Sequence, residues 1–115
     1  MRDQRDAPAA AVMRMCRRFC LTVLEPLRDR YGPCVVISGH RTPARNRAVG
    51  GARWSWHVWE WHPGELGVDV TFRRGNPSLW AAAAADTPAG GIGIYRLHLH
   101  VDSRPGRVTW SSTAA

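Results

Sequence analysis

The sequence predicts an α+β fold in which a long N-terminal helix packs on a small, mostly antiparallel sheet. Two observations lead to this prediction. Apolar residues recur at three- and four-residue steps between Val12 and Tyr31, which is the period of an amphipathic helix. Short strand-like segments bounded by Gly, Pro and Asn occupy much of the remaining chain. Because helices come first and a mostly antiparallel sheet follows, the α+β class fits best.

The first half of the chain is expected to begin with this helix. It starts at Pro8, kinks or restarts at Pro26, which breaks the backbone hydrogen-bond pattern, and ends at Gly32-Pro33. A short buried strand is expected over 34–38. A turn at 41–43 then leads into a short helix that Gly50-Gly51 close.

The second half is expected to supply most of the sheet. A Trp-rich loop precedes a strand over 67–72, and a helix starts near Asn76 and continues to Ala85. The last three strands, expected over 92–95, 97–103 and 107–110, form a meander. The predicted organisation is one domain over 8–111, with disordered ends at 1–7 and 112–115.

The composition is basic, with a net charge of +7 in 115 residues, and all 16 cationic side chains are Arg. Such a charge favours a polyanionic partner: nucleic acid, an anionic bacterial wall or an acidic membrane surface. The three cysteines form no CxxC pair, which argues against a zinc finger and favours buried free thiols. Arg14, Arg17 and Arg18 interrupt the N-terminal apolar stretch, so we expect no signal peptide, no membrane span and synthesis in the cytoplasm.

Histidine and aspartate gather in two strand-like segments. His98, His100 and Asp102 fall on one face of a strand because successive side chains alternate. Asp69 lies between two valines on another strand. Burial of such groups without partners costs about 2–7 kcal/mol each, so they must face water, a hydrogen-bond network or a metal ion. Two imidazoles and a carboxylate would form a metal site with room for a water molecule, the composition of catalytic zinc sites.

Several segments together resemble the M15 metallopeptidases, a family that includes zinc D-Ala-D-Ala carboxypeptidases and phage endolysin peptidases. The resemblance covers about residue 23 to Trp110. The segments are Leu24-Glu25-Pro26-Leu27-Arg28, Ile37-Ser38-Gly39-His40-Arg41-Thr42-Pro43, Asn46, Val49-Gly50-Gly51, Ser55-x-His57, Val68-Asp69, Gly91-Ile92-Gly93 and His100-Val101-Asp102.

This resemblance implies a compact α+β fold of the hedgehog/DD-peptidase type with a bound Zn²⁺. Carried over by position, the zinc ligands are His57, Asp69 and His100. Arg41 corresponds to an arginine that binds a substrate carboxylate, and Ser55 to the serine of the S-x-H motif. A zinc ion with three protein ligands keeps one position open for water.

The chain departs from the family pattern at two places. The family places the Asp ligand seven residues after the first His, whereas Asp69 follows His57 by twelve, so His62 competes for the ligand role. The Gly-Gly and Ser-x-His register favours His57. Many relatives also carry an acid three residues before the last His ligand, where this chain has a leucine.

Three residues are candidates to supply the missing acid–base function. His98 projects toward the metal face and could stabilise an oxyanion or relay a proton. Asp102 could act there or could hydrogen-bond a ligand histidine from behind. Glu60 is the third candidate, and Glu65 is a further carboxylate nearby in the sequence.

The expected function is hydrolysis of a peptide bond in the peptidoglycan stem peptide, as a D,D-carboxypeptidase or an endopeptidase. The protein is expected to be a monomer that acts on the anionic cell wall, and a phage could release it there. One alternative is a catalytically inactive wall-binding module with the same fold. Another is single-stranded nucleic-acid binding through Arg and Trp; the dispersed arginines and lack of a nucleic-acid motif make it the weaker one. The loop tryptophans could pack in the core or line a substrate groove, whereas Trp80 and Trp110 are expected in the core.

Overall fold

The fold was analysed in a computed structural model, which describes residues 10–59, 62 and 65–114. Three helical segments follow one another at the start: α2 (Ala10–Phe19), the π-helical segment η1 (Cys20–Leu24) and α3 (Glu25–Tyr31). The predicted long helix is therefore confirmed. Pro26 lies in the first turn of α3, so the helix restarts there after the wider π turn, as predicted.

The helix buries the predicted apolar stripe against the sheet. Phe19, Val23, Leu24 and Leu27 belong to the core. The helix ends at Gly32, whose φ of 85° is open to glycine and strained for other residues. The three cysteines are free but only half-buried, which corrects the prediction of buried thiols, and burial raises the pKa of the Cys34 thiol to about 11.

Five strands form one mixed sheet in the order β1-β2-β4-β3-β5. Their bounds are β1 (Cys34–Ser38), β2 (Gly67–Phe72), β3 (Gly91–Ile94), β4 (Leu99–Asp102) and β5 (Val108–Ser111). The pairs β1–β2, β2–β4 and β3–β4 are antiparallel, and β3–β5 is parallel. The predicted α+β class and mostly antiparallel sheet are confirmed.

The predicted meander of the last three strands is wrong, because β5 pairs in parallel with β3 and not with β4. After β4 the chain crosses the start of β3, and the Arg104 carbonyl lies so close to Gly90 that a Cβ there would overlap it. The Val108 N–H then donates to the Gly90 carbonyl at 3.0 Å and starts the new pairing. The glycine before β3 thus lets the chain pass to the far edge.

The strand predicted over 34–38 is confirmed, but the prediction that it is buried is wrong. β1 is an edge strand that pairs only with β2, and Val35, Val36 and Ile37 are each more than half exposed. Its apolar residues favour extended backbone without being covered. An apolar run alone does not distinguish a central strand from an edge strand.

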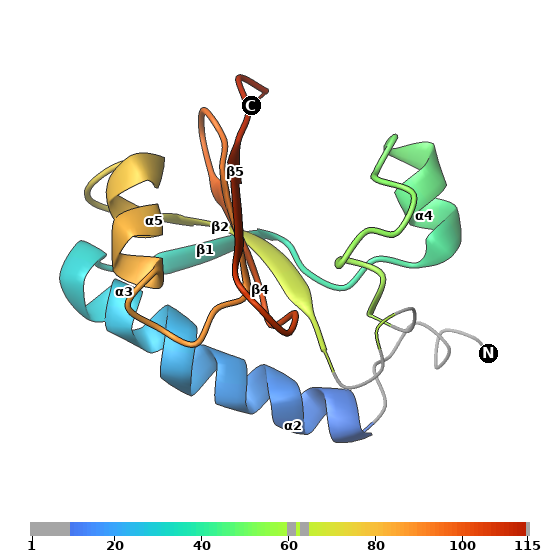
Figure 1. Cartoon of the computed structure of the whole chain (residues 1–115), viewed down its shortest axis with the longest axis horizontal. Helices are drawn as coiled ribbons and strands as arrows, with labels where there is room; N and C mark the ends of the chain where they lie inside the picture. The colour runs from blue at the N-terminus through green and yellow to red at the C-terminus, as the bar shows by residue number, and fades with distance from the viewer. Residues whose placement is uncertain (1–9, 60–61, 63–64, 115) are drawn as a thin grey trace.

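The two faces of the sheet have different neighbours. Val68, Val70, Leu99 and Val101 are buried in the core with the helical residues. The helix α5 (Pro77–Ala84), capped by Asn76 as predicted, contacts α3, β3 and β4. In Figure 1, α3 and α5 lie on one side of β4 and β5, and α4 (Pro43–Ala48) lies on the other.

The ends of the predicted domain differ in what can be described. Residues 1–7 lie outside the described part of the chain. Residues 112–114, expected in a disordered tail, are hydrogen-bonded: Ser112 N–H donates to the Ile94 carbonyl at 2.8 Å, and Ala114 accepts from Arg96 N–H at 3.0 Å. Across the described ranges, no helix is both long and apolar enough to cross a membrane.

Candidate metal centre

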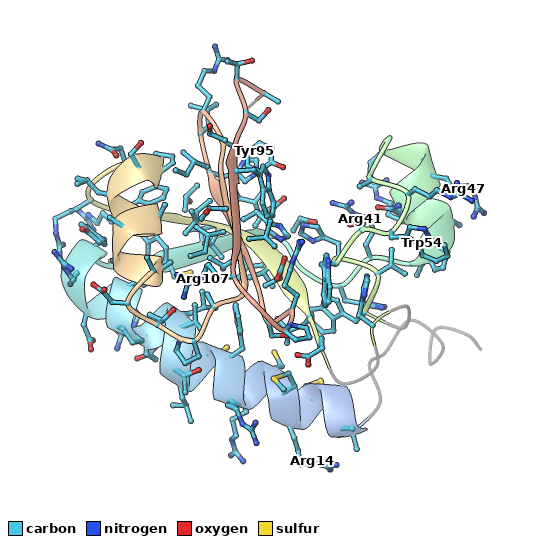
Figure 2. The ribbon with its side chains drawn as sticks, viewed as in Figure 1. Arg14, Arg41, Arg47, Trp54, Tyr95 and Arg107 are labelled. Carbon is cyan, nitrogen blue, oxygen red and sulfur yellow. The ribbon has the colours of Figure 1, made fainter. Side chains whose placement is uncertain are left out.

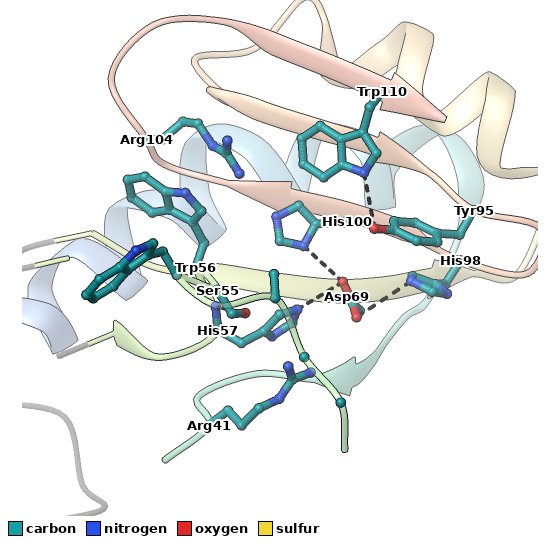
Figure 3. A pocket seen from close by; sticks show the side chains of 14 residues that line it. Arg41, Ser55, Trp56, His57, Asp69, Tyr95, His98, His100, Arg104 and Trp110 are labelled. Carbon is teal, nitrogen blue, oxygen red and sulfur yellow. Dashed lines mark hydrogen bonds and ion pairs between the residues drawn. The ribbon is translucent and has the colours of Figure 1, made fainter. Parts of the chain in front are cut away.

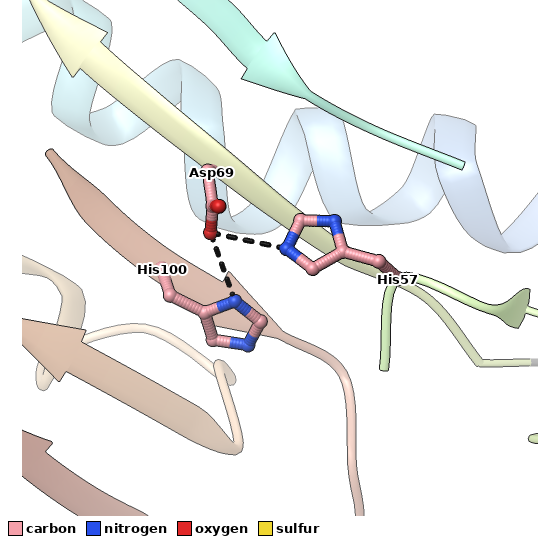
Figure 4. A group of neighbouring side chains, drawn as sticks. All are labelled: His57, Asp69 and His100. Carbon is pink, nitrogen blue, oxygen red and sulfur yellow. Dashed lines mark hydrogen bonds and ion pairs between the residues drawn. The ribbon is translucent and has the colours of Figure 1, made fainter. Parts of the chain in front are cut away.

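His57, Asp69 and His100 converge on one point. One ligand atom from each lies within 4.8 Å of the others. Asp69 Oδ1 is 3.1 Å from His57 Nε2 and 3.0 Å from His100 Nδ1. Figure 4 draws both contacts as dashed lines. The two histidines are buried and the aspartate is half-buried. Three side chains distant in sequence therefore present a nitrogen, an oxygen and a nitrogen to the same small volume.

Strand pairing and a loop bring these residues together. Asp69 on β2 lies directly opposite His100 on β4, so the register alone places their side chains side by side on one face. His57 comes from the loop after α4. Its carbonyl accepts from Arg41 N–H at 2.7 Å, its N–H donates to Ser55 Oγ at 3.1 Å, and Val58 beside it is fully buried.

The other nitrogen of each histidine has its own partner. His57 Nδ1 lies 2.9 Å from the Gly39 carbonyl, which can only accept, so this nitrogen carries the proton. His100 Nε2 lies 2.7 Å from Asp102 Oδ2, a carboxylate oxygen that also accepts. The nitrogens that face Asp69 are then lone-pair donors. Three acceptor atoms at one point require a cation, so the residues fit a metal ion.

Asp102 lies behind His100 and is fully buried. Its oxygens accept from the N–H groups of Gly91 and Arg104 at 2.8 and 3.0 Å, and from the Arg104 guanidinium at 2.6–3.0 Å. Asp102 does not line the pocket. The structure therefore places it as a partner of His100 rather than as a base beside substrate.

Without a cation in the site, protonation of the histidines would supply the positive charge that Asp69 attracts, and the pKa shifts have the signs that this requires. Burial alone would raise the pKa of Asp69, but hydrogen bonds and positive charge from His100 and His57 lower it well below its usual range. The pKa of Asp102 is lowered likewise, against the effect of burial, by His100 and Arg104. Burial would lower the pKa of His100, and the two carboxylates raise it instead. Both carboxyl groups are anionic at neutral pH.

A pocket of about 510 Å³ opens over the three residues. We call His57, Asp69 and His100 the metal group. Figure 2 places Arg41 on the α4 side of the pocket and Tyr95 on the sheet side. Figure 3 shows these two residues, His98 and Trp110 around the metal group. The Arg41 guanidinium donates to Asn46 Oδ1 at 2.8 Å and Ser38 Oγ at 3.2 Å, and burial lowers its pKa. These bonds hold the guanidinium at the pocket wall.

The remaining predicted site residues lie at different places. His98 lines the pocket, with Nε2 3.6 Å from Asp69 Oδ2 and a pKa lowered by burial. Ser55 also lines it, although its hydroxyl accepts from His57 N–H. Glu60 lies outside the described residues. Glu65 accepts from Ser103 Oγ at 2.6 Å and lines a different pocket.

His62 does not belong to the metal group. Its Nε2 lies 3.2 Å from the Trp54 carbonyl, and its ring stacks on Trp56 at 3.7 Å between centroids. Of the two histidines that compete for the ligand role, only His57 reaches Asp69. The longer spacing between His57 and Asp69 costs little, because the entropy of closing a chain segment grows slowly with its length.

Three pocket residues were missed by the sequence analysis: Tyr95, Arg104 and Trp110. Trp80 is in the core as predicted, but Trp110 is half-buried and lines the pocket, which corrects the prediction. The Arg104 guanidinium lies over the rings of Trp56 and Trp110, at 4.9 and 5.2 Å from their centroids. The alternation of side chains from His98 to Asp102 continues to Arg104, so this spacing could have predicted Arg104 as a site residue. The position of Trp110 depends on the pairing of β5 with β3, which no pattern in the sequence indicates.

A His/Asp/His group at the floor of an open pocket is an arrangement that metal-dependent enzymes use. The family model described as Peptidase M15 matches residues 3–102. The chain therefore belongs to the M15 peptidase family, whose members are metal-dependent, and it is a metallopeptidase by family. No curated protein matches the chain.

Proposed function

We propose that this chain is a zinc peptidase that hydrolyses a peptide bond in the peptidoglycan stem peptide. The observation that supports it most is the converging trio of His57, Asp69 and His100 beneath a pocket that also exposes Arg41. Two imidazoles and one carboxylate are a ligand set that zinc accepts, and they leave part of the coordination sphere open. A hedgehog/DD-peptidase-like arrangement is part of the same proposal.

The bound zinc would supply a polarised carbonyl and a water molecule whose pKa is lowered to about 7. Hydrolysis adds the water's OH to the carbonyl carbon and its remaining proton to the amine that leaves. Among the described residues, His98 is placed to hold or pass that proton, because it lines the pocket beside Asp69 and burial lowers its pKa.

Arg41 would bind a carboxylate of the substrate. Its guanidinium is fixed by Asn46 and Ser38 and lies in the pocket wall near the metal group. A planar fork of N–H donors matches a carboxylate in two bonds, and stem peptides carry a carboxylate at a terminal D-Ala or on a D-Glu residue. This geometry would orient the peptide bond over the metal.

The site of action in this proposal is the bacterial cell wall. A net charge of +7 attracts the protein to an anionic wall, and salt should weaken this attraction because screening acts over about 8 Å at physiological ionic strength. Wall binding measured at low and at moderate salt tests this part separately from catalysis.

The decisive experiment measures the metal content of the protein and its cleavage of purified stem peptides, with the released amine as the readout. We expect about one zinc per chain and loss of activity on chelation and in His100→Ala. His62→Ala should retain both zinc and activity. Cleavage that survives thorough chelation would contradict the proposal.

One observation favours a second candidate, a wall-binding module without catalysis. Where many relatives carry an acid, this chain has Leu97, which is 61% exposed and cannot transfer a proton. A module would bind zinc and wall material but release no amine from any stem peptide. The same experiment separates the two candidates.

A further inference from the structure

We propose that Tyr95 is a catalytic residue of this site: its phenol O–H donates a hydrogen bond to the carbonyl oxygen of the peptide bond being cut, as that oxygen gains negative charge. This inference rests on the proposed peptidase function and deepens it. No bond to Tyr95 forms or breaks, and its proton stays on the phenol oxygen throughout.

The hydrogen bond that Tyr95 already makes leaves its proton available. Trp110 Nε1 lies 3.1 Å from the Tyr95 hydroxyl. An indole N–H can only donate, so the phenol oxygen accepts this bond and its own O–H must point elsewhere. Among residues 10–59, 62 and 65–114, no acceptor for that O–H is found. A donor that faces this open pocket is therefore free to bind a ligand oxygen.

The tyrosine is held in place on two sides. Its N–H donates to the His98 carbonyl at 3.0 Å across the turn between β3 and β4, and the rings of Tyr95 and His98 stack at 4.4 Å with 9° between their planes. Trp110 lies opposite Gly93, where the absence of a Cβ makes room for the indole. Donors fixed before the reaction stabilise charge without reorganisation.

The hydroxyl lies beside the metal group. The Trp110 ring, whose N–H donates to the hydroxyl, has its centroid 5.3 Å from that of the His100 ring. The His98 ring, which stacks on the Tyr95 ring, has its Nε2 3.6 Å from Asp69 Oδ2. Figure 3 shows the Tyr95 hydroxyl directed inward, toward the side of the pocket where His100 and Asp69 lie. The proposal places the carbonyl oxygen of the scissile bond on this side of the pocket.

Tyr95 does not replace the acid that many relatives carry where this chain has Leu97, because the phenol keeps its proton; it adds stabilisation of negative charge instead. The hydrogen bond that the Trp110 N–H donates to the phenol oxygen polarises the phenol and makes its O–H a stronger donor. Removal of one oxyanion donor in other hydrolases lowers kcat by about 10²- to 10³-fold. Tyr95→Phe removes the hydroxyl alone and keeps the ring that stacks on His98.

The test compares Tyr95→Phe with Tyr31→Phe, since the chain has two tyrosines and Tyr31, the last residue of α3, packs against the core and does not line the pocket. We expect kcat to fall about 10²-fold or more in Tyr95→Phe, with KM and zinc content unchanged. Calorimetry with zinc-loaded protein should show a similar loss of affinity for a phosphinate analogue of the scissile dipeptide, whose oxygens mimic the oxyanion. Affinity for the product peptide should not change.

Failure of this inference differs from failure of the proposed function. Wild-type activity together with an equally active Tyr95→Phe variant would overturn the role of Tyr95 alone. A parallel loss of zinc affinity or thermal stability in Tyr95→Phe would assign the hydroxyl a structural role and overturn it too. Zinc-loaded wild-type protein that cleaves no stem peptide would contradict the peptidase function itself, and the role of Tyr95 with it.

Discussion

Replacement of Asp102 by asparagine tests whether the carboxylate behind His100 sets the state of the metal ligand. In the native site, Oδ2 accepts from His100 Nε2–H, so Nδ1 faces Asp69 with a lone pair. Oδ1 accepts from Gly91 N–H. An asparagine that keeps this last bond turns its NH₂ group toward His100. Nε2 must then accept, and the proton moves to Nδ1, where a metal ion should bind.

Two magnitudes follow for Asp102→Asn. Loss of a hydrogen-bond partner of a ligand histidine typically weakens metal affinity by about 10- to 100-fold, or roughly 1.4–2.8 kcal/mol. The substitution also leaves the Arg104 guanidinium without its carboxylate, although this side chain is partly exposed and stacked on two indoles. Loss of one partner from a buried ion pair costs about 3–5 kcal/mol, and we expect the lower end.

The assay is a zinc titration against a competing chelator, with chemical denaturation of the metal-free protein measured separately. Asp86→Asn is the matched control, because Asp86 is exposed on the turn after α5. Zinc affinity equal to wild type in a folded Asp102→Asn variant would refute the role of Asp102 in fixing the tautomer. A loss of stability without a loss of affinity would show that the carboxylate serves the fold alone.

The remaining predictions concern ligands, substrate, core and pH. His57→Ala should lose stoichiometric zinc whereas His62→Ala should retain it, by metal analysis; the reverse result would exchange their roles. Arg41→Lys should raise KM about tenfold for a substrate with a carboxylate and leave zinc content unchanged, because an ammonium lacks the planar fork. Leu27→Ala, at a fully buried position, should lower the free energy of unfolding by about 2–5 kcal/mol in denaturant titration. Folding lowers the pKa of Asp102 below the value of about 3.9 that the group has in the unfolded chain. The stability that this shift contributes is fully present above the unfolded pKa and is lost as pH falls through the folded pKa. Metal-free Asp102→Asn should therefore lose less stability in acid than the wild type.

Local chemistry was sufficient to predict most elements of this fold. The apolar stripe predicted the long helix, Asn76 and the turn at 41–43 predicted helix starts, and strand alternation placed His100 and Asp102 on one face. These features depend on neighbours within a few residues. The order of strands depends on where the chain crosses, and the close approach of Arg104 to Gly90 that permits the crossing joins residues 14 positions apart.

The metal group was predictable only in part, for a related reason. Asp69 and His100 follow from strand pairing, but the choice between His57 and His62 depends on how the loop folds. The loop places His62 on the Trp56 ring, and the Gly39 carbonyl orients His57. Neither contact leaves a pattern in the local sequence. The resemblance to M15 peptidases supplied the register that spacing alone did not.

The crossing of β5 also explains why the pocket has one aromatic wall that a meander would lack. If β5 had paired with β4, it would have displaced either β2, which holds Asp69 opposite His100, or β3, which holds Gly93 opposite His100. By crossing to the far side of β3, the chain keeps the β2–β4 pairing intact and carries Trp110 opposite Gly93. Trp110 can then contact Tyr95, His100 and Arg104 together. The same crossing that defeats prediction from local sequence therefore builds the side of the site where we place the oxyanion.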